Sequence, residues 1–237
     1  MSFYEKNCSL KLITIMITAL LSPHVQAGDA NSDFQTWIPV NINVKMGEQL
    51  RGFFEIQPRV GNDSSHMVSM MLRPAIGWAI TPKASIWAGY LMSADSKNLY
   101  SNQYLIENRA WQGFTWRDMA EDKQFIWEMR NRLEERFLPH NSDPSIRWRT
   151  RFRTEYIIDE SPVSLIASEE IFVNLNDNAY NANLKAGAQQ NRAYLGFGYR
   201  FMPEFQIESG YLYQHVWRKT TEDASNSVWM TNFNINF

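Results

Sequence analysis

The stretch RWRTRFRTEY, residues 147–156, places arginine at every second position, and this spacing is the strongest chemical pattern in the chain. In an extended segment, alternate side chains share one face, so the arginines from Arg147 to Arg153 point the same way and Glu155 follows them. Such a row of guanidinium groups could contact a nucleic-acid backbone, bind an anion, or form one wall of a closed structure. Which of these three roles applies depends on the structure that the rest of the chain forms.

A second charged segment, residues 125–137, alternates in the same manner, with mostly apolar odd positions such as Phe125 and Trp127. A face that carries this many charges cannot pack into a dry core, so it needs water or a face of opposite charge. A barrel with an apolar outside and a polar lumen supplies both. The lumen wall predicted from these segments and their neighbours comprises Arg130, Arg132, Arg136, Arg147, Arg149, Arg151, Arg153, Glu107, Glu128, Glu134, Glu155 and Glu170.

Two roles are open for this charged wall. One is a ladder of ion pairs that fills the lumen and fixes the strand register, because charges at this spacing pair across neighbouring strands. The other is a constriction that attracts anions, as arginine rings do in pores. Binding to nucleic acid is disfavoured because strand closure turns these arginines inward, away from a phosphate backbone. The sequence leaves open whether every arginine is paired.

A second candidate site is the pair His140-x-Ser142 in the segment PHNSDPS, residues 139–145. This spacing resembles the catalytic pair of outer-membrane phospholipase A and of lipid A deacylases, in which the hydroxyl attacks an ester and the imidazole takes its proton. The glycine and asparagine pattern of those enzymes is absent, and the composition is also that of an ordinary turn. A lipid hydrolase is therefore the alternative function, and the main expectation is a protein that is not an enzyme.

No cofactor or metal site is expected. Residues 174–181 carry oxygen side chains but lack the glycine and distal glutamate of a calcium loop. His66, His140 and His215 show no metal-ligand spacing. Residues 196–200, GFGYR, lie within a predicted strand, where glycine relieves crowding and does not cradle a phosphate.

The first 27 residues have the pattern of a secretory signal peptide. Lys6 and Lys11 precede the apolar run at 12–21, and the small residues of VQA suit cleavage after Ala27. The one cysteine, Cys8, lies before that run, so the remaining chain, 28–237, has no disulfide and is predicted to be one domain. The formal charge of −2 implies no polyelectrolyte partner.

The rest of the chain is predicted to be an all-β, antiparallel transmembrane barrel. Short turns alternate with longer polar connections, as in the periplasmic turns and extracellular loops of outer-membrane barrels. Eleven candidate strands emerge, but such barrels have an even number, so twelve strands are expected, with ten as the alternative. A missed strand, a wrongly divided strand, or threading of residues 28–36 through the lumen would each explain the mismatch. The candidate strands are 34–45, 49–60, 66–80, 84–92, 103–116, 123–138, 145–158, 163–175, 189–202, 204–217 and 227–237.

Aromatic residues add two predictions. The last strand places Phe233, Ile235 and Phe237 on one face and ends on phenylalanine, which resembles the C-terminal signal that the barrel-assembly machinery recognises. Tryptophans near the strand ends are expected to point outward into the two membrane interfaces. These tryptophans are Trp37, Trp78, Trp116, Trp217 and Trp229.

Several segments together, among them MRNRLEERF, RWRTRFRTEY and IESGYLYQH, resemble the domain-of-unknown-function 2490 family over roughly Phe34 to Phe237. The resemblance implies an outer-membrane barrel and no established activity. The expected protein is a narrow or plugged outer-membrane barrel of a Gram-negative bacterium, acting as a structural envelope protein or a small-solute or anion channel. Its expected partners are outer-membrane lipid and the assembly machinery, without nucleic acid, and its small-molecule ligand is unknown. A secreted, soluble β protein is the competing class.

Overall fold

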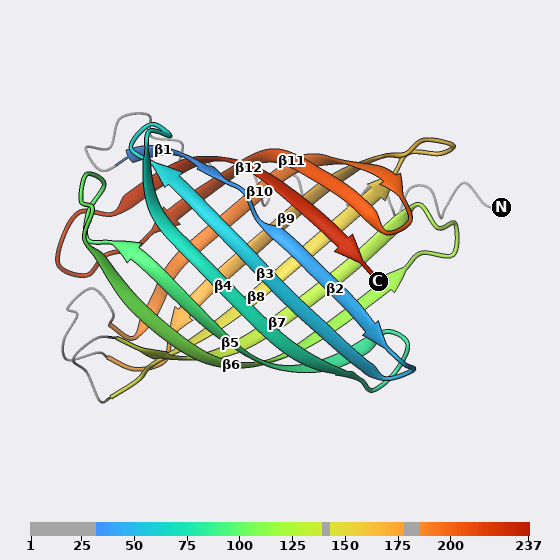
Figure 1. Cartoon of the computed structure of the whole chain (residues 1–237), viewed down its shortest axis with the longest axis horizontal. Coiled ribbons are helices and arrows are strands. Elements are labelled where there is room, and N and C mark those ends of the chain that lie inside the picture. The colour runs from blue at the N-terminus through green and yellow to red at the C-terminus, as the bar shows by residue number, and fades with distance from the viewer. Residues whose placement is uncertain (1–31, 139–142, 178–184) are drawn as a thin grey trace. The chain divides into compact units, whose positions relative to one another are not determined.

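The computed structural model describes residues 32–138, 143–177 and 185–237, and within these ranges the chain forms one twelve-stranded sheet that closes into a barrel (Figure 1). The all-β, single-barrel prediction is confirmed. None of these residues forms a helix that is long and apolar enough to cross a membrane. The strands are β1 (Ser32–Trp37), β2 (Val40–Met46), β3 (Leu50–Gly61), β4 (His66–Ala79), β5 (Ala84–Ser96), β6 (Tyr104–Met119), β7 (Phe125–Phe137), β8 (Ser145–Ile157), β9 (Val163–Asn174), β10 (Gly187–Met202), β11 (Phe205–Val216) and β12 (Ala224–Asn236).

Alternation of side chains explains why these segments form strands. In β10, Leu195 and Phe197 are exposed on the outer face, while Arg192 and Tyr194 line the interior. Each strand from β3 to β12 has its sequence neighbours as partners, so the pairings are hairpins that tight connections can make. The period of two in the sequence therefore becomes an outer apolar face and an inner polar face.

The two ends of the barrel differ in their connections. One end, here the turn rim, has the short connections 47–49, 80–83, 120–124, 158–162 and 203–204. The other end, here the loop rim, has the connections 62–65, 97–103 and 217–223, and it is also where β7 ends and β8 begins and where β9 ends and β10 begins. Backbones with positive φ, at Gly47 and Lys123, help to reverse the chain at the turn rim. The predicted alternation of short and longer connections is thus present except at 62–65, whose four residues make it no longer than the turns.

The barrel closes where β1 and β2 run parallel to β12 (Figure 1). Both strands keep one register against β12, and both also pair antiparallel with β3, so together they fill a single position in the barrel. Ile38 and Pro39 interrupt this position because proline has no N–H to donate. At the turn rim, the N–H of Phe237 donates to the carbonyl of Asn43 at 2.8 Å, and the N–H of Lys45 donates to the carbonyl of Phe237 at 2.7 Å.

This seam resolves the mismatch in the strand count. The predicted number of twelve is confirmed for the described residues, because the candidate strand 34–45 is divided at Ile38–Pro39. The strands nevertheless occupy eleven positions around the barrel, so the first and last run in the same direction and pair in parallel. The purely antiparallel closure that was expected is wrong at this seam, since an odd number of positions forces one parallel pairing.

The start of β1 is attached to the loop rim by a residue that the predicted strand 34–45 left out. The Asp33 carboxylate accepts the backbone N–H groups of Asn62 and Asp63, both at 3.2 Å. Asn62 and Asp63 both adopt the left-handed conformation, with φ of 52°. This conformation is accessible to Asn and Asp, and it turns their amides toward the carboxylate. The β3–β4 connection therefore holds the first strand in place.

Apolar residues in the interior form two small clusters and no continuous core. Trp37, Ile166, Tyr194, Leu212 and Val228 form the first cluster, and Met71, Leu91 and Trp111 form the second. The remainder of the interior is polar and charged. The inner wall is therefore the place where the chemistry of this protein must be sought.

Candidate functional site in the barrel interior

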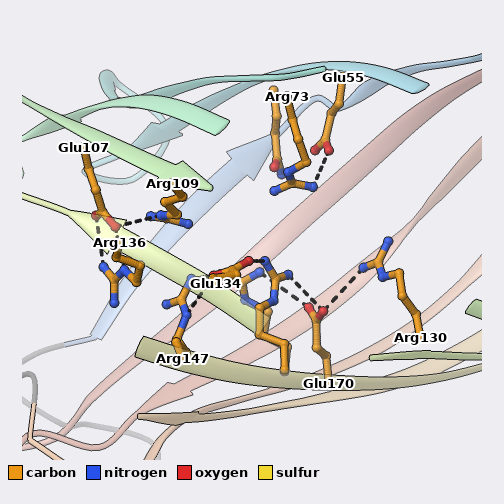
Figure 2. A network of polar contacts seen from close by, with 12 residues as sticks. Glu55, Arg73, Glu107, Arg109, Arg130, Glu134, Arg136, Arg147 and Glu170 are labelled. Atoms are coloured by element: carbon orange, nitrogen blue, oxygen red, sulfur yellow. Dashed lines mark hydrogen bonds and ion pairs between the residues drawn. The ribbon is translucent and has the colours of Figure 1, made fainter. Parts of the chain in front are cut away.

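The inner faces of neighbouring strands bring the predicted charged residues together (Figure 2). The register of β7 and β8 places Glu134 opposite Arg147, Arg132 opposite Arg149, and Glu128 opposite Arg153. Every charged residue of the predicted wall lies on an inner-facing position, and all are wholly or largely buried. The structure thus gathers the whole predicted set within one lumen.

Glu134 is the most completely enclosed carboxylate of this wall, with its side chain 1% exposed. One of its oxygens accepts from Arg147, at 3.0 Å from Nε and 2.5 Å from Nη2. The other accepts from Nη1 of Arg149 at 2.6 Å. Charge-assisted bonds of this kind are about twice as strong as neutral ones. Glu134 thus connects β7 to two successive inner-facing residues of β8, Arg147 and Arg149.

Glu170 on β9 extends the network to the next strands. Its Oε1 accepts from Nη2 of Arg149 at 2.9 Å and from Nη2 of Arg130 at 3.4 Å. Arg192 on β10 approaches its Oε2 at 3.8 Å. Arg149 therefore links Glu134 with Glu170, and the ladder runs over four adjacent strands.

Toward the loop rim, Glu107 on β6 holds two arginines. It accepts from Nε of Arg109 at 2.7 Å and from Arg136, at 2.5 Å from Nε and 3.0 Å from Nη2 (Figure 2). The forked contact with Arg136 crosses from β7 to β6, so it fixes the pairing of those strands as well as satisfying both charges.

Toward the turn rim, contacts cross the lumen between strands that are not neighbours. Arg153 on β8 donates to Glu155 at 3.0 Å and to Glu208 on β11 at 2.7 Å. Glu155 also accepts from Gln206 on β11 at 2.8 Å. Arg151 is paired with Glu128. These cross-lumen bonds narrow the interior from wall to wall.

The predicted wall did not include charged residues from strands that carry only one or two inner-facing charges. Glu55 on β3 and Arg73 on β4 pair at 2.5 Å, and both are buried. Arg59, Arg192 and Glu208 also line the interior. The alternation of each strand contains this signal, because each of these residues shares the inner parity of its own strand.

Arg132 on β7 is a buried arginine of the predicted wall without an ion pair among the described residues. Of the described carboxylates, none lies within ion-pair distance of it, and its Cζ stacks 4.0 Å from the ring centroid of Trp111. Arg59 is similar, because it stacks 3.6 Å from the centroid of Trp37 and donates at 3.2 Å to the Gln57 side chain. Cation–π contacts of this type stabilise a buried guanidinium without neutralising its charge.

Exposure of the wall changes along the barrel axis. Near the turn rim, the Arg151 side chain is 25% exposed and that of Arg200 is 44% exposed. Around Glu134, Arg147 and Glu107, the side chains are almost completely buried. A cavity of about 840 Å³ occupies the interior. Its mouth at the turn rim is bordered by the parallel ladder of Asn43 and Asn236 and by Phe237.

The prediction that Trp37 lies in an outer aromatic belt is wrong. Its side chain is 1% exposed, and it packs inside between Arg59 and Arg192. The period of β1 and β2 gives the reason, since Trp37 shares the parity of Asn41 and Asn43, which also line the cavity. Trp78, Trp116 and Trp229 occupy outer positions of their strands, where Trp78 and Trp229 are exposed and Trp116 is half-buried. Trp217 lies just past the end of β11 and is half-buried.

The structure describes only some of the other predicted sites. His140 and Ser142 lie outside the described residues, as does the predicted signal peptide, 1–27. Phe233 and Ile235 occupy outer positions of β12, whereas Phe237 lies past its end. No group of three or more His, Cys, Asp or Glu residues in the described part of the chain could hold a metal ion.

A family model and a related protein match this chain. The sequence model of the family "Protein of unknown function (DUF2490)" matches residues 34–226. An uncharacterized protein of Methylorubrum extorquens is 30% identical over 184 residues, which cover 77% of this chain and 78% of that protein. Neither match comes with a described activity, so the interpretation of the site depends on its geometry.

Proposed function

We propose that this chain, which belongs to the DUF2490 family of proteins of unknown function, is an integral barrel of the outer membrane of a Gram-negative bacterium, where it acts as a closed, structural envelope protein. The observation that carries the proposal is the inverted polarity of the barrel. Charged and polar side chains line most of its inside, and large apolar side chains are exposed on its outside. Soluble monomers rarely expose apolar surface on this scale, whereas a bilayer stabilises it.

The exposed apolar residues lie on strands around the barrel, not in one patch. Those on its outer face include Phe54, Ile56, Ile76, Trp78, Ile86, Tyr90, Ile106, Phe152, Leu165, Ile171, Leu195, Phe197, Tyr199, Tyr211 and Trp229. Because they surround the barrel, one docked partner protein would leave much of this surface in water. A lipid annulus would cover all of it.

The closed state is supported by the ion pairs. Charges that line a continuous water path are solvated, but Glu134, Arg147 and Glu107 are nearly inaccessible to solvent. The bonds of Arg153 and Gln206 across the lumen narrow the turn half as well. A small-anion channel is the second version of this function, and the surplus of arginine in the lumen favours it.

Lysine substitutions on the outer face test the membrane location. Leu195, in the middle of β10, is 64% exposed, and Ile80, at the turn rim, is 55% exposed. Lysine at a bilayer midplane costs about 2–4 kcal/mol and near an interface about 0–1 kcal/mol. We expect Leu195→Lys to reduce the heat-modifiable, membrane-extracted form strongly, and Ile80→Lys to leave it intact. A soluble barrel would tolerate both substitutions and remain in the aqueous fraction.

Planar-bilayer recording separates the two versions of the function. A lumen closed by paired charges should give no steady conductance after insertion of the wild-type protein. Replacing Glu134 with alanine, which unpairs Arg147 and enlarges the space, should then allow brief, anion-selective openings if the fold persists. Steady anion-selective current through the wild type, reduced by Arg149→Ala and Arg151→Ala, would instead establish the channel version.

Two expectations remain within this proposal. Phe233, Ile235 and Phe237 would present the end of β12 to the barrel-assembly machinery, and outer-membrane lipid would be the permanent partner of the outer face. Hydrolysis by His140 and Ser142 stays a separate hypothesis. Unchanged acyl chains in outer-membrane lipid after Ser142→Ala would contradict it.

A further inference from the structure

We propose that the barrel interior binds an oxyanion, the carboxylate or phosphate group of a small solute, at Arg132 with Arg130 and Arg73, and that the solute enters through the turn rim. This inference goes beyond a structural role. It depends on the geometry of the lumen and not on the location of the barrel in a membrane.

Arg132 provides the first argument, because it is a buried donor without an acceptor. The residue is 4% exposed, and its Nε and Nη1 have no hydrogen-bond partner among the described residues. Its guanidinium face covers the Trp111 ring, and this stacking does not supply a hydrogen-bond acceptor for Nε and Nη1 at the guanidinium edge. Leaving buried donors of a charged group unsatisfied is costly, and such donors mark a place where a ligand is stabilised.

Glycines on β5 and β6 make room for this stacked pair. A Cβ atom at Gly89 would lie 2.5 Å from Cε2 of Trp111, so only glycine on β5 lets the indole lie flat against the wall. A Cβ at Gly113 on β6 would lie 2.7 Å from the carbonyl oxygen of Asn131 and 3.1 Å from Cγ of Arg132. These close approaches set the position of the Arg132 side chain and thereby preorganise it.

Charge provides the second argument. Arg132 lies opposite Arg149 in the register of β7 and β8, and its inner-facing neighbours along β7 are Arg130 and Glu134. The Glu134 oxygens are already occupied by Arg147 and Arg149. A central charge layer with nine arginines and five carboxylates can be defined among the described residues, so four positive charges are in excess. The layer consists of Arg59, Arg73, Arg109, Arg130, Arg132, Arg136, Arg147, Arg149 and Arg192, with Glu55, Asp95, Glu107, Glu134 and Glu170.

Two other arginines, Arg73 and Arg130, also have N–H groups that are not fully used in hydrogen bonds. Arg73 uses Nη1 for Glu55, and its Nε has no partner in the described part of the chain. Arg130 contacts Glu170 at 3.4 Å (Figure 2), and the Arg130 side chain is 19% exposed. An oxyanion beside Arg132 would therefore meet further guanidinium groups without breaking the Glu134 pairs. Guanidinium groups match both carboxylate and phosphate, which accept their donors in pairs.

Access comes from the turn rim. The cavity that Arg132 lines also reaches Asn43, Asn236 and the exposed Arg200 at that rim. Its volume of about 840 Å³ is that of a small-molecule site and exceeds what a single inorganic ion requires. Arg117 and Arg200 at the mouth would raise the local concentration of anions.

Calorimetric titration of the folded, full-length mature protein in a nonionic detergent tests the proposal. Inorganic phosphate and succinate serve as probes, and glucose serves as the neutral control. We expect phosphate, succinate or both to bind, and Arg132→Gln to weaken that binding about tenfold or more. Binding of phosphate alone would assign a phosphate group, and binding of succinate alone a carboxylate. Lys83→Gln removes one exposed charge at the turn rim that does not line the cavity, and it should change the affinity less than about twofold.

A second measurement needs no variant that might fail to fold. Phosphate or succinate should raise the unfolding temperature of the wild type above its value in chloride at the same ionic strength, because a ligand of the folded state stabilises it. Equal unfolding temperatures in all three salts, or equal affinities of the wild type and Arg132→Gln, would overturn the proposal. A membrane location disproved by the lysine substitutions would leave this result unaffected.

Discussion

Replacing Glu134 with glutamine should lower the free energy of unfolding by about 3–5 kcal/mol, the cost of breaking a buried ion pair by removal of one partner. Glutamine keeps the shape of the side chain but removes the negative charge. Arg149 would retain Glu170, whereas Arg147 would keep only the amide of Gln189, at 3.1 Å. The penalty therefore arises chiefly from one buried, uncompensated guanidinium.

Denaturant unfolding in detergent micelles, followed by tryptophan fluorescence, would measure this change. The double variant Glu134→Gln with Arg147→Gln should be more stable than Glu134→Gln alone, because it removes the unpaired cation together with its partner. Asp118→Asn is the matched control, since it breaks the exposed Lys83–Asp118 pair at the turn rim and should have little effect. Equal losses for Asp118→Asn and Glu134→Gln would contradict the buried network.

Replacing Trp37 with alanine should also cost about 3–5 kcal/mol, as expected for deletion of a fully buried aromatic side chain. The Trp37 ring packs with Ile166, Leu212 and Val228 and carries Arg59 on its face. Its loss would leave a cavity and would remove the cation–π contact of a guanidinium that has no ion pair in the described structure.

Trp78→Ala is the control for this substitution, because Trp78 is on the outer face and is 48% exposed. The two substitutions remove the same ring from opposite sides of the barrel wall. If Trp37 lay in an outer interfacial belt, as its position near a strand end suggested, both variants would lose similar stability. The inward orientation predicts a clearly larger loss for Trp37→Ala, measured by the same unfolding experiment.

The barrel itself was predictable because its information is local. Alternation in segments such as 125–137 and 147–156 assigns one face to charge and the other to apolar side chains. Connections rich in Gly, Pro and Asp mark where strands reverse. The error at Trp37 arose because β1 and β2 carry few charges that would mark their inner face. Trp37 was placed outside because it lies near a strand end, whereas the alternation of side chains along β1 and β2 places it inside.

The sequence by itself determined that this chain forms a barrel with arginine and glutamate facing inward, since a period of two depends only on side-chain order. Only the tertiary structure decided which charges meet. Closure in eleven positions brings Glu208 of β11 to Arg153 of β8, and competition for Glu134 and Glu170 leaves Arg132 without a carboxylate. Partners across a lumen are set by register and closure, which are properties of the whole sheet and not of any one strand.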